Sequence, residues 1–273
     1  MKTLVCFHAH PDDESIATGG SIARASREGH RVVLVMATDG RHGETPADLE
    51  ASETLQDRRA RETEKSAEVL GVQRLVWLGY HDSGMTGWPQ NELPNAFMNA
   101  DLDEAARALA QVIEEEDADV VTCYDWHGGY GHPDHIQVHR VGHRAVEMVR
   151  ATGKTVRLLE STMNRTRIVQ MMREMMSQMG EQATDGDDSS NFDPEGPADD
   201  GNPFGSTEDE ITMAVDVAEL VDLKRASIAC HASQMGDSSM FLNMAPEMFA
   251  HAFGTEWFIE PGQSGGAQPG WFL

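Results

Sequence analysis

The chain has 273 residues, three cysteines and a formal net charge of −25. This length buries a core without disulfides, and three scattered cysteines argue against a disulfide framework. The negative charge disfavours nucleic acid and anionic membranes as partners, and no apolar run is long enough to span a bilayer. The first residues hold too little charge and apolar length for a secretory signal, so we expect a cytoplasmic protein with no nucleic-acid or membrane partner.

Strands and helices alternate along the first 160 residues. Short apolar runs predict strands over 3–8, 31–37, 74–78, 118–123 and 156–160. Amphipathic stretches predict helices over 14–28, 56–70, 102–116 and 133–150. This alternation indicates an α/β fold, a Rossmann-like and mostly parallel sheet flanked by helices. Such sheets bind ligands outside the carboxyl ends of their strands.

The rest of the chain is expected to form a smaller C-terminal portion. Apolar residues at helical spacing, most of them Met, predict a helix over 168–179, and both core packing and a pliable wall near a substrate remain open. Residues 181–210 hold eleven acidic side chains and no Lys or Arg, which is typical of a solvated, flexible loop. A strand over 211–215 and a helix over 222–232 follow. We expect one domain over 1–273, divided into a core over 1–165, the acidic loop and a C-terminal portion over 211–273.

Two short polar strings stand where predicted strands end. The string HPDDE at 10–14 follows the first strand, and HPDH at 132–135 follows the fourth. A catalytic zinc usually takes three protein ligands from His and carboxylates, plus a water. His10 and Asp13, three residues apart in a tight turn, can face one point, and His135 could supply the third ligand. The two strings therefore predict a metal-dependent hydrolase.

The remaining residues of the strings could carry proton transfer. Asp12 is left free near the metal and could take the proton of an activated water. His132 could stay off the metal and stabilise an oxyanion or protonate a leaving group. Asp134 could hold the His132 ring and raise its pKa.

A simpler interpretation exists for part of this pattern. The first string alone could be a turn in which Asp12 or Asp13 caps the following helix. A second string at another strand end makes that interpretation the weaker one. His139 and His143 lie one and two turns beyond His135, and we interpret them as residues of the helix surface.

The motifs resemble the PIG-L/LmbE family of zinc-dependent N-acetylglucosamine deacetylases over most of the chain outside the acidic loop. The matching segments are AHPDDE at 9–14, GHPDH at 131–135, Arg59 with Glu62 ahead of LGV at 70–72, and DSGM at 82–85. The last segment and GGY at 128–130 resemble the mycothiol-type branch, as do Lys224, HASQ at 231–234 and EWF at 256–258. That branch holds the deacetylase of mycothiol biosynthesis and the mycothiol S-conjugate amidase.

The resemblance implies a role for each matching residue. His10, Asp13 and His135 match the ligands of one Zn²⁺ per chain, and Asp12 matches the general base. His132 matches the histidine that stabilises the charged intermediate and assists the leaving amine, with Asp134 as its partner. Tyr130 matches a mobile tyrosine that polarises the amide carbonyl. Arg59 and Asp82 match positions that hold sugar hydroxyls.

The resemblance implies a hydrolase that removes an N-acetyl or related N-acyl group from a small-molecule substrate containing a 2-amino sugar. Carboxylate and free amine would be the products. An S-conjugate amidase and a noncatalytic metal-binding α/β protein are the alternatives. A nucleotide-binding module is weaker, because no GxGxxG follows the first strand. Iron(II) or another divalent ion could replace zinc, and the oligomeric state stays open.

Overall fold

The structure is a computed structural model that describes residues 1–179, 193–236 and 239–273, with the backbone alone at 175–179 and 240. Within these residues, eight strands form one sheet in the order β3-β2-β1-β4-β5-β7-β6-β8. The strands are β1 (Thr3–His8), β2 (Arg31–Thr38), β3 (Arg74–Tyr80), β4 (Val120–Tyr124), β5 (Arg157–Thr162), β6 (Met213–Asp216), β7 (Thr255–Ile259) and β8 (Gln268–Pro269).

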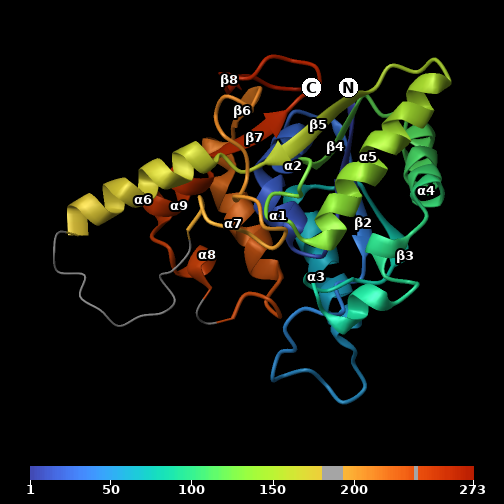
Figure 1. The fold of residues 1–273 in the computed structure, drawn as a ribbon, viewed down its shortest axis with the longest axis horizontal. Helices are drawn as coiled ribbons and strands as arrows, with labels where there is room; N and C mark the ends of the chain where they lie inside the picture. The colour runs from blue at the N-terminus through green and yellow to red at the C-terminus, as the bar shows by residue number, and fades with distance from the viewer. Residues whose placement is uncertain (180–192, 237–238) are drawn as a thin grey trace.

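Helices cover both faces of this sheet (Figure 1). They are α1 (Asp13–Ala17), α2 (Gly19–Arg27), α3 (Leu55–Leu70), α4 (Leu102–Glu115), α5 (Pro133–Ala151), α6 (Arg165–Met179), α7 (Val221–Cys230), α8 (Met240–Asn243) and α9 (Pro246–Phe253), with short 3₁₀ helices at Pro89–Glu92, Phe97–Asn99 and Ala218–Leu220. Helices α4 and α5 pack together on one face, and α2, α3 and α7 pack together on the other. No helix in the described part of the chain is both long and apolar enough to cross a bilayer.

The predicted α/β fold is confirmed. Strands β3, β2, β1, β4 and β5 run parallel. Each predicted strand of the core begins and ends within two residues of the observed strand. Every residue of β1 and β4 is buried, as expected of parallel strands covered on both faces. The chain leaves β1 toward β2 and β3, and later returns on the other side of β1 to form β4. This reversal leaves a crevice at the carboxyl ends of β1 and β4, where the two polar strings begin.

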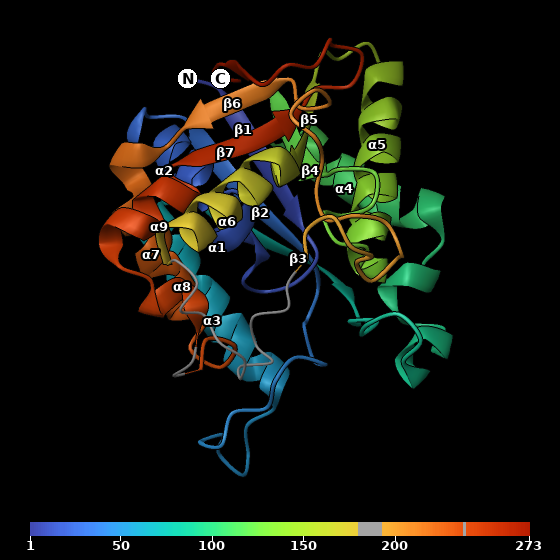
Figure 2. The ribbon, with the colours of Figure 1, turned by 60° about the vertical axis from the view of Figure 1, so that its left-hand side comes forward.

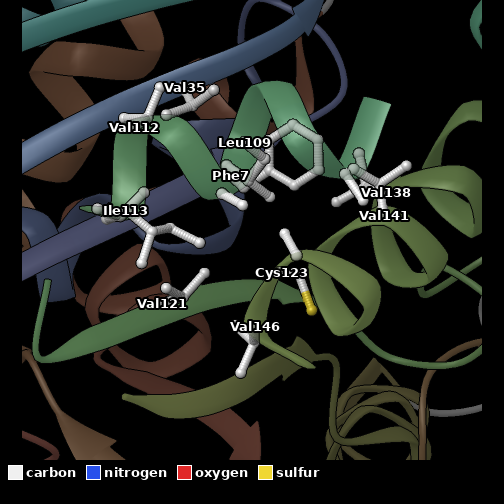
Figure 3. Packing of buried hydrophobic residues seen from close by; sticks show 14 of the residues in the cluster. Phe7, Val35, Leu109, Val112, Ile113, Val121, Cys123, Val138, Val141 and Val146 are labelled. Carbon is white, nitrogen blue, oxygen red and sulfur yellow. The ribbon is translucent and has the colours of Figure 1, made fainter. Parts of the chain in front are cut away.

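Two apolar clusters hold the helices on the sheet. One lies between the sheet and α4 and α5 and includes Phe7, Leu109, Val121 and Cys123 (Figure 3). The other lies on the opposite face. Because both faces of β1 are packed in this way, the start of the first polar string is fixed by buried apolar contacts rather than by a loop.

The single helix expected over 14–28 is wrong, because the chain breaks at Thr18 into α1 and α2. The Glu256 carboxylate accepts hydrogen bonds from the backbone N–H groups of Gly20 and Ser21, 2.8 Å each, at the first turn of α2. Lys224 Nζ lies 2.6 Å from Glu256, and both side chains are buried. A carboxylate from β7, more than 230 residues away, therefore sets the start of α2.

The C-terminal portion joins the same sheet. Strand β7 lies antiparallel between β5 and β6, which run side by side with it in Figure 2. The predicted strand over 211–215 and helix over 222–232 correspond to β6 and α7, whereas β7 was not predicted. It is only five residues long, and buried residues alternate with half-buried ones along it.

The predicted helix over 168–179 is confirmed as α6, in which Ile168 and Met171 are half-buried. The side chains of Met175, Met176 and Met179 lie outside the described residues. So does the first part of the acidic segment, 181–192. Residues 193–210 form only isolated bridges, but they are hydrogen-bonded to the loop after β4, so this part is not solvated throughout.

Candidate metal centre and active site

The first polar string forms a tight turn directly after β1. The Asp13 carboxylate accepts a hydrogen bond from the backbone N–H of His10, at 2.8 Å. Asp12 has a φ of 104°, which is unusual for a residue other than glycine and costs about 1–3 kcal/mol. At the start of α1, the Asp13 carboxylate contacts His10, whereas the Asp12 carboxylate contacts Arg59. The turn therefore separates the two carboxylates, as two different roles require.

The second string starts α5 after a glycine-rich loop. Pro133 occupies the first position of the helix, where a missing N–H does no harm. Gly128, with a φ of 68°, approaches the helix so closely that a Cβ there would lie 2.2 Å from His135 Cβ. The Gly128 carbonyl is 3.0 Å from His135 Nδ1. This contact places the His135 proton on Nδ1 and leaves a lone pair on Nε2.

The three predicted metal ligands converge at the carboxyl ends of β1 and β4. Asp13 Oδ2 lies 3.3 Å from His135 Nε2 and 3.4 Å from His10 Nδ1. Burial alone would raise the pKa of Asp13, but the two histidines hold it well below its usual range. His135 Nε2 is buried and has no hydrogen-bond partner among the described residues. An unpartnered lone pair beside a carboxylate and a second imidazole fits a divalent metal ion.

The other ring nitrogen of His10 faces two carboxylates. His10 Nε2 is 3.1 Å from Asp134 Oδ2 and 3.5 Å from Asp82 Oδ1. Ser83 donates to Asp134 through both its N–H and its hydroxyl group, and backbone N–H groups donate to Asp82. These carboxylates could themselves join His10 as metal ligands. Both carboxylates already accept hydrogen bonds from other groups. Their contacts therefore favour a role in orienting the His10 ring over a role as metal ligands.

We expected the Asp134 carboxylate to hold the His132 ring. This expectation is wrong, because the carboxylate contacts His10 and Ser83 instead. The backbone N–H of Asp134, not its carboxylate, contacts His132 by donating to Nδ1 at 3.1 Å. The expected rise in the pKa of His132 is also wrong. Burial, together with repulsion from His10 and His135, lowers the pKa of His132 to about 2. The ring is neutral and, with Nδ1 accepting, carries its proton on Nε2. A nitrogen of His132 also lies within 4.8 Å of those of His10 and His135.

The Asp12 carboxylate contacts the guanidinium group of Arg59. Arg59 Nη2 is 3.2 Å from Asp12 Oδ2 and also donates to the Pro11 carbonyl, while Nη1 donates to Gly40 O at 2.6 Å. Burial raises the pKa of Asp12 to about 6, although the attraction of Arg59 acts against the rise. A carboxylate with a pKa near 6 can both take and return a proton close to neutral pH.

Arg59 and Asp82 are the two residues expected to hold sugar hydroxyls. Each is only 4% exposed. Arg59 binds the turn around Asp12, and Asp82 contacts His10. Burial would raise the pKa of Asp82, but His10 and two backbone N–H donors hold it well below its usual range. Contact of either residue with a sugar stays a prediction.

Tyr130 packs against the predicted metal ligand His135. Its ring meets His135 edge-on at 4.9 Å between centroids and stacks at 6.4 Å on Phe204 from the described part of the acidic segment. The backbone of the same segment reaches the tyrosine, because Asp199 N–H donates to Tyr130 O at 2.9 Å. The acidic segment therefore contacts the residue for which the family resemblance implies a role at the substrate carbonyl.

Buried contacts of Glu14 support the first polar string, and they were not predicted from the sequence. The Glu14 carboxylate accepts from the Asp12 N–H at 3.0 Å and lies 2.7 Å from His231 Nε2. Burial opposes ionisation of Glu14, but His231 and Ser66 lower its pKa to about 2. Sequence motifs mark both Glu14 and His231, yet nothing in a separation of 217 residues predicts that they meet.

A mostly parallel α/β sheet with a His/Asp centre and a strained, spare carboxylate at its switch point is the arrangement of a hydrolase. The family profile described as "PIG-L: GlcNAc-PI de-N-acetylase" matches residues 5–146. The 1D-myo-inositol 2-acetamido-2-deoxy-alpha-D-glucopyranoside deacetylase of Acidothermus cellulolyticus is 36% identical over 270 residues, 95% of this chain and 88% of that protein. Its namesake from Geodermatophilus obscurus is 33% identical over 291 residues, 99% and 95% of the two chains.

A solved structure shares the fold. The N,N'-diacetylchitobiose deacetylase of Pyrococcus horikoshii superposes with a TM-score of 0.59 at 24% identity, covering 94% of this chain and 82% of that one. The present chain belongs to the PIG-L family and is an N-deacetylase.

Proposed function

We propose that this enzyme removes the N-acetyl group of an acetylglucosaminyl-inositol, releasing acetate and a free 2-amino sugar. The names of its full-length relatives support the substrate. The observation that carries the chemistry is the unpartnered Nε2 of His135, which faces Asp13 and His10 beside the strained Asp12.

His10, Asp13 and His135 would hold one divalent ion, which we take to be zinc. A hard carboxylate with two imidazoles and no thiol is a common set for catalytic zinc and also suits iron(II). When bound, such an ion makes water nucleophilic near neutral pH and polarises the acyl oxygen.

Proton transfer falls to the chain's own residues. Asp12 accepts the proton of the attacking water and becomes neutral, for which a pKa of about 6 is suitable. The neutral His132 ring donates from Nε2 to the developing oxyanion, and the Tyr130 hydroxyl group donates there as well. The proton held by Asp12 then passes to the leaving amine, so that one water is consumed and no net proton remains on the enzyme.

Replacing Asp12 with Asn tests this assignment. Acetate release from the acetylglucosaminyl-inositol should fall by about 10²–10⁴-fold, while the metal content of the chain stays unchanged. Asp119→Asn is the matched control, because Asp119 lies at the opposite end of the sheet and bonds Lys2 and Thr3. Near-normal turnover by the Asp12 variant would refute the assignment of the base.

The substrate is tested separately with the wild-type chain. Acetate release is compared with cleavage of a mycothiol S-conjugate at equal concentrations. Faster cleavage of the conjugate would replace the proposed deacetylation with the amidase activity. Metal binding without turnover of either substrate would favour a noncatalytic metal protein.

A further inference from the structure

A second group of metal-ligating side chains lies beneath α5, separate from the hydrolytic centre. Cys123 on β4 and Glu160 on β5 are register partners in a parallel ladder, so their side chains share one face of the sheet. His139 and His143 are four residues apart on α5, which places them on one side of the helix. Ligand atoms of Cys123, His139 and His143 lie within 4.8 Å of one another. Figure 3 shows Cys123 in the cluster beneath α5.

Glu160 closes this group on its open side. Its Oε1 lies 2.6 Å from His143 Nε2 and 3.7 Å from His139 Nδ1. Ligand atoms on a tetrahedral zinc are about 3.3 Å apart for bonds of about 2.0–2.1 Å, so small side-chain shifts would accommodate an ion. Cys123 is 1% exposed, whereas the His143 side chain is 37% exposed, which gives an ion a path from solvent.

The Glu160 carboxylate gives this group a negative charge that could bind a cation. Among the described residues, no Lys or Arg forms an ion pair with Glu160; its ion-pair partners are the two imidazoles. Burial, then repulsion from His143, lowers the pKa of His139. Burial, then Glu160 and Asp125, raises the pKa of the Cys123 thiol well above its usual range. Without a metal ion, the largely buried Glu160 carboxylate contacts only the two imidazoles, while the Cys123 thiol donates to the Tyr124 carbonyl, which also lies 3.1 Å from His139 Nδ1.

We propose that Cys123, His139, His143 and Glu160 form a second zinc site that fastens α5 to β4 and β5. On binding, the thiol proton passes to solvent, and the thiolate and carboxylate together neutralise the two charges of the ion. Four protein ligands leave no open position, so the site is structural rather than hydrolytic. Because α5 begins with the HPDH string, the ion would also stabilise the helix that carries His135.

Cobalt(II) distinguishes the two sites, because only the proposed one contains a thiol. The full-length protein is stripped with a chelator and titrated with cobalt(II), and thiolate-to-cobalt charge transfer in the near ultraviolet is recorded. Metal per chain is counted by elemental mass spectrometry. We expect two ions per chain and the thiolate band in the wild type. His143→Asn should retain one ion and lose the band; this partly exposed position makes misfolding a small risk.

Further variants separate this proposal from the hydrolytic centre. Asp13→Asn should lose one ion and keep the band, and zinc should raise its melting temperature. The Asp13→Asn/His143→Asn double variant should show no such rise. Cys230→Ser, which removes a thiol elsewhere, should behave as the wild type. One ion per chain without a thiolate band in the wild type would overturn the proposal. So would a band that survives in both Cys123→Ser and His143→Asn.

Discussion

Gly128 offers a direct way to disturb the metal centre without touching a ligand. A Cβ at this position would lie 2.2 Å from the Cβ of His135, whereas ordinary carbon contacts are about 3.5–4.0 Å. Gly128→Ala must therefore push His135 away by more than about 1 Å. Metal–ligand distances tolerate only about 0.2 Å, so we expect metal affinity to fall at least about 10–100-fold, as it does when an outer contact of a ligand is lost.

The cost in stability has two parts. Alanine in the left-handed region costs about 1–2 kcal/mol, and forced overpacking adds about 1–3 kcal/mol. Gly128→Ala should thus lower the free energy of unfolding by about 2–5 kcal/mol. Gly153→Ala is the matched control, because Gly153 has a φ of 91° at the far end of α5 and an added Cβ would meet no atom within 4 Å. It should cost only the backbone part.

The assay combines denaturant unfolding of both metal-free variants with titration of zinc by competition against a chelator. The metal-free comparison isolates the clash, since a bound ion would add its own stabilisation to the native state. Equal losses of stability in the two variants, together with unchanged zinc affinity in Gly128→Ala, would refute the reasoning. That result would mean that the loop moves and His135 does not.

Three further outcomes are expected. Lys224→Met should cost about 3–5 kcal/mol in urea unfolding, because it leaves the Glu256 carboxylate buried without its cation; a loss under 1 kcal/mol would contradict this. Hydrogen bonds from Arg31 and Arg74 lower the pKa of Glu116 to about 2 in the folded chain. The stabilisation that these bonds give should be complete above the unfolded pKa of about 4.5 and lost as the pH falls toward 2. Glu116→Gln should therefore make the free energy of unfolding less dependent on pH in that range. An unchanged pH dependence would argue against the interaction of Glu116 with the two arginines. Chelation should reduce acetate release to background and zinc should restore it; full activity in the stripped protein would exclude a metal role.

The parts of the fold that local pattern determines were predictable from the sequence. Buried apolar runs and helix-ending glycines located β1 to β5 and the helices between them, because these signals are carried by adjacent residues. The break at Thr18 was not predictable in this way. It depends on the Glu256 carboxylate, which reaches α2 only after β7 has joined the sheet. Strand β7 itself is short and half-buried, so its pattern carries little signal.

In the hydrolytic centre, too, some features follow from local sequence and topology, whereas others depend on distant residues. His10, Asp13 and His135 belong to compact strings at strand ends, and the topology brings strand ends together, so their convergence follows from the fold. The direction of the Asp134 carboxylate does not follow from its neighbours in sequence. It is set by Ser83, which arrives from the end of β3 and turns the carboxylate toward His10 instead of His132.

The histidines of α5 show where local spacing is ambiguous. Spacing of four on a helix indicates only that His139 and His143 share a side, and the surface interpretation is natural when nothing else is known. The register of β4 against β5 adds the missing information, since it sets Cys123 and Glu160 opposite that side. Partial exposure of the histidines is then what entry of an ion requires, rather than a sign of an idle surface. The measurement of metal per chain therefore decides between the surface interpretation, which helical spacing alone favours, and the proposed zinc site.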